Sequence, residues 1–281
     1  MYSRGQCDHV LASLLMQESE DAVSMKYPHI DPVLIHFGPF AVRWYGLMYV
    51  VGFLLGYFLL LKFSQREQYD LTKDEVGDLL YFCIAGLVIG ARLGYCLIYN
   101  FSYYMHEPLK MFAVWEGGMS FHGGLAGAAI AGWFFARRRN KSLLMIADLG
   151  AVAAPLGLFF GRIGNFINGE LYGRVTTVPW GMVFPGAGNF PRHPSQLYEA
   201  FLEGVVLFSI LLWLSRKRRP HGFLMASFLT GYGVFRFFLE FFREPDPQIG
   251  FVIGPFTMGQ VLCSIMVAAG ILLFWLCRRR G

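Results

Sequence analysis

Seven long apolar runs, separated by short polar stretches, dominate the pattern of this chain. They cover residues 45–62, 77–99, 119–136, 143–160, 196–214, 222–241 and 258–277. About 20 apolar residues are enough for a helix to cross the roughly 30 Å hydrocarbon core of a bilayer. The pattern therefore predicts an all-α polytopic membrane protein, a bundle of about seven transmembrane helices. The third and fourth runs are rich in glycine and alanine, which predicts closely packed helices there.

Basic residues predict the orientation of this bundle. Lysine and arginine cluster after the odd-numbered runs, at residues 62–73, 137–141, 216–219 and 278–280. Seven spans place all four clusters on one side of the membrane, and the positive-inside rule makes that side cytoplasmic. We expect the N-terminus outside and the C-terminus inside.

The first 24 residues differ from the rest because they are polar and acidic, with one short apolar patch. They lack the basic start and the small-residue cleavage site of a secretory signal. Met25 opens a more plausible start, MKYPHIDP. We predict that residues 1–24 are an extension, either disordered or upstream of the native start. Residues 25–281 are predicted to form a single transmembrane domain.

Several chemistries are excluded by missing residues. The five cysteines have no CxxC spacing, and HExxH, Walker-type and GxSxG motifs are absent from the sequence. We therefore expect no metal, no cofactor and no nucleic-acid partner.

The segment 161–174, GRIGNFINGELYGR, follows the fourth apolar run directly. Its glycines permit close backbone approach, and Arg162 has the planar fork that suits a phosphate. A segment interrupted by Gly and Asn is tolerated at membrane depth only against protein or water. The segment predicts a polar pocket for an anionic head group, formed with Asn165, Asn168, Glu170 and Gly173. The alternative is an ordinary loop with one snorkelling arginine.

The sixth run contains a second polar group, in GYGVFRFFLEFFRE. At 100° per residue, Tyr232, Arg236, Glu240 and Arg243 fall within a helical arc of about 80°. The alternative is an Arg236–Glu240 pair that only neutralises itself.

Further candidates lie near the predicted outer ends of other runs. His122 stands between glycine pairs in GGMSFHGG and is a candidate general base. Tyr45 suits an interfacial anchor. Arg92 and His193 are accessory candidates, in the second run and just before the fifth.

These motifs resemble those of a known family. The segments IDPV, RWYGLMY, EGGMSFHGG, GRIGNFINGELYGR, PRHPSQLYE and GYGVFRFFLEFFREPD resemble those of the bacterial prolipoprotein diacylglyceryl transferases, and the resemblance covers about residues 28–278. It implies that the enzyme transfers the sn-1,2-diacylglyceryl group of phosphatidylglycerol to the lipobox cysteine thiol of a preprolipoprotein, releasing glycerol 1-phosphate. It also implies a catalytic domain in the bacterial inner membrane, with an active site toward the outer leaflet.

The resemblance also implies residue roles. Arg162 corresponds to the family's phospholipid-binding arginine, and Asn165, Glu170 and Gly173 to further signature positions. His122, Tyr45, Tyr232, Arg236 and Glu240 correspond to residues important for catalysis. Asn168 is expected to bind the glycerol head group or to brace the loop. The segment between Arg174 and Arg192 is shorter than in some relatives, which leaves docking of the acceptor open.

Two other functions remain as alternatives. A transporter or lipid flippase would carry buried charge through the full membrane depth, whereas the inner halves of these runs are mostly apolar. An intramembrane hydrolase would need a pair such as Ser120 and His122, which a helix directs apart.

Overall fold

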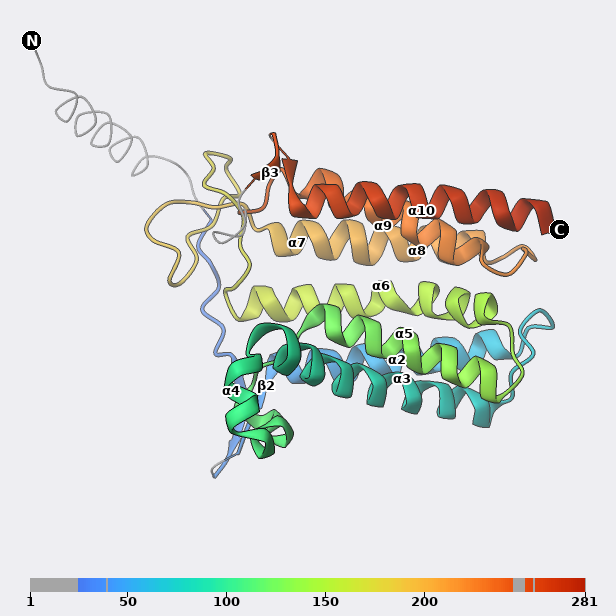
Figure 1. Cartoon of the computed structure of the whole chain (residues 1–281). Helices are drawn as coiled ribbons and strands as arrows, with labels where there is room; N and C mark the ends of the chain where they lie inside the picture. The colour runs from blue at the N-terminus through green and yellow to red at the C-terminus, as the bar shows by residue number, and fades with distance from the viewer. Residues whose placement is uncertain (1–24, 39, 245–250, 255, 281) are drawn as a thin grey trace, which may run out of the picture. The chain divides into compact units, whose positions relative to one another are not determined.

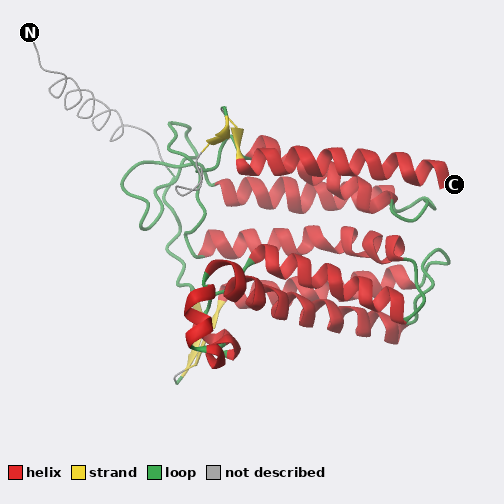
Figure 2. Ribbon diagram, in the orientation of Figure 1, coloured by secondary structure: helices red, strands yellow, loops and turns green. Residues whose placement is uncertain are grey.

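Helices account for most of the computed structural model, which describes residues 25–38, 40–244, 251–254 and 256–280. Figure 2 shows that the remaining regular structure is two short pairs of strands. The extension predicted at residues 1–24 lies outside the described residues.

All seven apolar runs correspond to helices (Figure 1). These are α2 (Trp44–Ser64), α3 (Lys73–Gly94) with the π-helical η1 (Tyr95–Tyr99), α5 (Phe121–Arg138), α6 (Leu143–Ile167), α7 (Ser195–Glu199) continuing through the π-helical η4 (Ala200–Val206) into α8 (Leu207–Leu214), α9 (Phe223–Leu239) and α10 (Met258–Arg280). Between η1 and α5 lie α4 (Phe101–His106) and the 3-10 turns η2 (Pro108–Phe112) and η3 (Val114–Glu116).

Five of these helical segments are long and apolar enough to cross a membrane, within the part of the chain that the structure describes. They are Trp44–Ser64, Lys73–Tyr99, Leu143–Ile167, Ser195–Leu214 and Met258–Arg279; Phe223–Leu239 is a shorter apolar helix. The prediction of a polytopic helical membrane protein is confirmed. The count of seven spans and their orientation stay predictions.

The chain divides into two compact units. The described residues within Met1–Phe53, Ala154–Trp213 and Ser227–Leu272 form one unit. Those within Leu54–Ala153, Leu214–Ala226 and Leu273–Gly281 form the other. We call them the first and the second unit and describe each by itself.

Glycines allow α3 and α5 to pack closely in the second unit. Gly86, Gly90 and Gly94 recur every fourth residue on α3, and they face Gly123 and Gly127 on α5. A Cβ atom built on Gly90 would lie 2.8 Å from the Cα of Gly127. Small residues at this spacing bring two helix backbones together, so packing in lipid gains dispersion contacts where there is no hydrophobic driving force. The expected tight packing of the third run is confirmed.

A buried carboxylate caps the start of α9 within the same unit. Asp148 on α6 is 3% exposed, and its two oxygens accept hydrogen bonds from the amides of Gly222 (2.7 Å) and Met225 (2.8 Å). These amides lie at the start of α9, where N–H groups have no partner in their own helix. Asp148 thus supplies a cap from a distant part of the sequence.

Two similar hairpins open helices in the first unit. β1 (Val33–Phe37) pairs antiparallel with β2 (Phe40–Arg43) before α2, and β3 (Phe251–Ile253) pairs antiparallel with β4 (Phe256–Thr257) before α10. Each hairpin carries the sequence Gly-Pro-Phe, and its glycine, Gly38 or Gly254, has a positive φ. The chain therefore contains a short local repeat that sets the start of two helices.

The fourth apolar run forms a longer helix than predicted. We expected the helix to end at residue 160, but α6 continues to Ile167 and carries Arg162 and Asn165. The prediction of a broken segment from residue 161 was wrong over its first half. Gly169, with φ +66°, follows the helix end, and the Tyr27 hydroxyl donates to the carbonyls of Phe166 (2.6 Å) and Ile167 (3.0 Å).

The glycine contact predicts a clear mutational contrast on α3. Gly90→Ala should destabilise the protein by about 1–3 kcal/mol, because the added methyl group overlaps the α5 backbone. Gly77→Ala is the matched control, since Gly77 lies on the same helix and an added Cβ meets nothing within 4 Å. Thermal unfolding in detergent measures both variants, and equal melting temperatures would contradict the close approach.

Candidate active site

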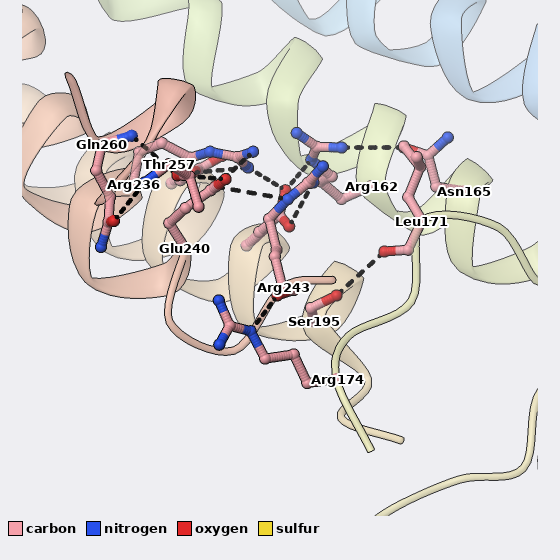
Figure 3. A network of polar contacts seen from close by, with 12 residues as sticks. Arg162, Asn165, Leu171, Arg174, Ser195, Arg236, Glu240, Arg243, Thr257 and Gln260 are labelled. Atoms are coloured by element: carbon pink, nitrogen blue, oxygen red, sulfur yellow. Dashed lines mark hydrogen bonds and ion pairs between the residues drawn. The ribbon is translucent and has the colours of Figure 1, made fainter. Parts of the chain in front are cut away.

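The carboxylate of Glu199 lies at the centre of a buried ionic cluster in the first unit. Its side chain is 0% exposed and pairs with three arginines: Arg162 (Nε, 2.6 Å), Arg236 (Nη1, 2.8 Å) and Arg243 (Nη1, 3.1 Å). Figure 3 shows how these guanidinium groups converge from separate segments of the chain. A buried charge is tolerated when it is paired in this way.

A second carboxylate, Glu240, lies across the same arginines. It contacts Arg236 Nη2 at 3.2 Å and Arg243 Nε at 3.6 Å. The hydroxyl of Thr257 donates to Glu240 Oε1 at 3.1 Å (Figure 3). Thr257 and Gln260 also form reciprocal side-chain to backbone hydrogen bonds at the start of α10, the geometry of a capping box. The start of α10 therefore fixes the position of Glu240.

The π-helical turn η4 follows Glu199 directly and contains a third carboxylate, Glu203. Gly204 beside it packs on Phe159 of α6, where an added Cβ would lie 2.7 Å from that residue's Cβ. Single π turns in α-helices occur frequently at functional sites. The turn and this glycine bring Glu203, which is also 0% exposed, to 3.8 Å from Arg236.

Asn165 connects Arg162 to the loop after α6. The Arg162 guanidinium donates to Asn165 Oδ1 (3.4 Å), and Asn165 Nδ2 donates to Glu170 Oε1 (2.8 Å). Asn168 Nδ2 donates to the same Glu170 oxygen at 3.3 Å. In this structure these three side chains brace one another.

The beginning of α7 secures the other side of that loop. Ser195 Oγ donates to the Leu171 carbonyl (3.1 Å), and Gln196 Nε2 donates to the Glu170 carbonyl (2.7 Å). Leu171 has a positive φ of 57°, so the loop adopts a backbone conformation that non-glycine residues rarely use. The side chains of Ser195 and Gln196 therefore hold the loop after α6 in addition to beginning α7.

Gly173 lies where three backbone segments meet. Its N–H donates to the His193 carbonyl at 2.9 Å, and the next amide, of Arg174, donates to the Phe242 carbonyl at 2.9 Å. A Cβ on Gly173 would lie 2.8 Å from the Cβ of His193. Only glycine fits this position without movement of a neighbour.

Tyr45 and Tyr232 also belong to the first unit. The ring of Tyr45 packs on Gly164 of α6, where an added Cβ would come within 2.8 Å, and its hydroxyl lies 3.2 Å from that of Tyr49. Tyr45 therefore lies against the helix that carries Arg162 and Asn165. Tyr232 lies on α9, one turn before Arg236.

His193 is enclosed by aromatic rings. Its Nδ1 lies 3.2 Å from the Tyr198 hydroxyl, and its ring contacts Phe242 edge-on at 5.2 Å between centroids. Burial lowers the pKa of His193 below its usual value of 6.5.

Arg92 and His122 belong to the second unit. Arg92 donates to five backbone carbonyls, those of Met111, Gly117, Gly118, Lys110 and Ala113, at 2.5–3.1 Å. A guanidinium has five N–H donors, so these carbonyls match its full capacity. Ser120 caps α5 by accepting from the Gly123 amide (3.2 Å), and His122 is exposed in the first turn.

The cluster of Arg162, Arg236 and Arg243 is suited to an anion, because guanidinium groups match the oxygens of a phosphate. No group of three or more candidate metal ligands occurs in residues 25–38, 40–244, 251–254 and 256–280.

Comparisons with known proteins show the family of this chain. A model of the prolipoprotein diacylglyceryl transferase family matches residues 32–276. The chain belongs to this family.

Its relatives share about half of its residues. A protein of Geobacter sulfurreducens is 54% identical over 256 residues, covering 91% of this chain and 98% of its own. Relatives from Coxiella burnetii strain RSA 331 (53% identical; 90% and 98% covered) and Aliivibrio fischeri strain ES114 (53% identical; 91% and 92% covered) are similar over most of their length. All three are named phosphatidylglycerol–prolipoprotein diacylglyceryl transferase.

Within the buried ionic cluster, sequence reasoning missed Glu199 and Glu203. Both lie inside the fifth apolar run, and an ionisable residue inside a span is a candidate functional residue by default. That signal was present in the sequence. Sequence reasoning also placed Arg243 on the face of the sixth helix, which was wrong, because α9 ends at Leu239. Turns after the helix still bring Arg243 to Glu199.

The central position of Glu199 predicts a large loss of stability when its charge is removed. Glu199→Gln leaves three buried guanidinium groups without their shared partner, which should cost about 3–5 kcal/mol. Glu244→Gln is the control: Glu244 pairs with Arg192 at 2.5 Å but is 47% exposed, so its loss should cost about 1 kcal/mol or less. Thermal unfolding in detergent compares them, and similar melting temperatures would contradict a central role.

The lowered pKa of His193 predicts acid sensitivity. Because the folded form binds this proton less readily than the unfolded form, stability should fall as the pH drops below about 6.5. His193→Gln should flatten this part of the profile, measured as melting temperature against pH. An acid slope that is unchanged in the variant would mean that other groups cause it.

Proposed function

We propose that this protein transfers the sn-1,2-diacylglyceryl group of phosphatidylglycerol to the lipobox cysteine thiol of a preprolipoprotein and releases glycerol 1-phosphate. The observation that carries the proposal is the convergence of Arg162, Arg236 and Arg243 on Glu199, in a chain of this family. The phosphodiester of the donor needs such cationic donors. The names of the relatives agree with both substrates.

The reaction requires stabilisation of the leaving group. The acceptor sulfur attacks the diacylglyceryl carbon, a C–S bond forms, and the C–O bond to phosphate breaks. Its electron pair stays with glycerol phosphate, whose charge changes from one negative charge to two. Arg162 and Arg236 bind the phosphate and stabilise this increase, since fixed donors aimed at developing charge lower a barrier. Glu240, held by Thr257, orients Arg236.

The acceptor supplies the nucleophile, so the enzyme needs no reactive cysteine or serine of its own. We assign His122 as the base that takes the thiol proton, because a neutral imidazole has a nitrogen lone pair that can accept it. Tyr45, Tyr232, Glu170 and the two asparagines position the head group or its binding loop. Arg92 and Gly173 support the backbone by their contacts described above.

The proposed setting is the bacterial cytoplasmic membrane, with the site open to the outer leaflet. The basic clusters at residues 62–73, 137–141, 216–219 and 278–280 support a cytoplasmic C-terminus. Phosphatidylglycerol then reaches the arginines laterally from the outer leaflet.

Removal of Arg162, which is proposed to bind the phosphate, tests the function. Arg162→Ala should lower transfer by about 10²–10³-fold, by analogy with the loss of one oxyanion donor. Purified protein is incubated with phosphatidylglycerol and a lipobox peptide, and mass spectrometry detects the diacylglyceryl adduct. Arg139→Gln is the control, because Arg139 pairs with Asp78 and its side chain is 45% exposed. Transfer by Arg162→Ala at the wild-type rate would refute the role of Arg162 in binding the phosphate.

The role of His122 predicts a change in pH dependence. His122→Ala should lower the transfer rate and change the shape of its pH dependence, because the group that accepts the thiol proton is lost. The rate of glycerol-phosphate release against pH measures this. A profile with an unchanged shape would exclude His122 as the base.

A further inference from the structure

Glu203 differs from the other carboxylates of the arginine cluster. Its side chain is 0% exposed, and among the described residues neither of its oxygens has a hydrogen-bond partner. Its ion pair with Arg236 is 3.8 Å long, near the outer limit for such a contact. An ionised carboxylate in this position would lack the compensation that burial demands.

Glu199, one turn earlier, shows what an ionised carboxylate in this environment receives. It has three arginine contacts between 2.6 and 3.1 Å. The nitrogen of Arg236 that faces Glu203, Nη1, already lies 2.8 Å from Glu199, and its Nη2 lies 3.2 Å from Glu240. Two carboxylates therefore contact Arg236 more closely than Glu203 does.

The charged and titratable groups that act on Glu203 come from each element packed around it. They are Arg162 on α6, Glu199 on α7, Tyr232 and Arg236 on α9, Arg243 after α9, and Cys263 on α10. Glu240, also after α9, contacts Arg236. The three arginines favour an ionised Glu203. The carboxylate of Glu199 and full burial oppose it, and the closest cation is already paired.

The protonation state of Glu203 decides the charge of the whole cluster. Three guanidinium groups against three carboxylates would be neutral, and a phosphodiester entering a neutral buried site would leave an uncompensated charge. With Glu203 protonated, one positive charge remains. That single charge equals the single negative charge of a phosphatidylglycerol head group.

We propose that Glu203 holds a proton in the resting protein, and that this neutral carboxyl keeps the arginine cluster cationic so that it accepts the donor's phosphodiester. The inference rests on the proposed function for its second part. Glu203 acts here as a positioning residue, because it sets the charge available to the arginines. The protonation itself concerns the free protein and does not depend on any substrate.

Infrared spectroscopy of the lipid-free protein tests the protonation. Wild type should show the C=O absorption of a protonated carboxyl group, and Glu203→Gln should lack it. Glu244→Gln, which removes an exposed carboxylate, should keep it. Absence of a band that depends on Glu203 overturns the proposal.

Donor kinetics test the consequence. Glutamine is neutral and similar in shape to a protonated glutamate, so Glu203→Gln should keep the KM for phosphatidylglycerol within about threefold at neutral pH. If Glu203 were ionised instead, its neutralisation would add one positive charge to the cluster and lower KM by more than about threefold. In wild type, KM should rise at the alkaline pH at which the infrared band disappears, by at most about tenfold per pH unit for one proton. In Glu203→Gln it should stay flat.

Each outcome distinguishes the two proposals. A change of more than about threefold in the KM of Glu203→Gln at neutral pH, in either direction, overturns the role of Glu203. Loss of the wild-type band without a change in KM also overturns it. The infrared band of wild type could persist at every pH at which the protein stays folded. In that case equal KM values for wild type and Glu203→Gln support the role of Glu203, and unequal values overturn it. Absence of any diacylglyceryl transfer by the wild type refutes the proposed function and leaves the infrared result standing.

Discussion

The ionic contacts of Glu199 are the constraint on which the site depends. One buried carboxylate binds three guanidinium groups that belong to α6, to α9 and to the turn after α9. Without it, like charges would repel one another at close range in a medium of low dielectric constant. The helices and loops of the first unit must therefore hold their relative positions to keep these charges compensated. The same contacts hold the three guanidinium groups close together around one carboxylate.

Backbone features supply the accuracy that this ionic cluster needs. Gly164 allows the Tyr45 ring to pack against α6, and Gly204 allows Phe159 to pack beside the π turn. Gly173 fits between two other backbone segments. At each of these positions a methyl group would shift an element that carries a charged residue. These glycines therefore allow close contacts between elements, as the glycines between α3 and α5 do.

Much of this architecture could be predicted from the sequence, because apolar runs of membrane length have few alternatives to helices. Arg162, Arg236 and Glu240 stood out for the same reason, as costly residues near spans. Glu199 was overlooked because its partners lie 37 to 44 residues away in sequence, and no local pattern pairs it with Arg236 or Arg243. The end of α6 was misplaced because Gly161 and Gly164 suggested a break, while packing against Tyr45 sustains the helix.

The opposing charges also explain why so polar a cluster is compatible with an apolar bundle. Arginines held only by a substrate would be unstable whenever the substrate was absent, whereas full neutralisation by carboxylates would leave nothing to attract an anion. Glu199 and Glu240 compensate most of the positive charge through short contacts. Glu203 is buried at the edge of the same group with no hydrogen bond from the described residues. A carboxyl group that can be neutral resolves the conflict, because it permits a stable resting cluster that still has one charge to offer.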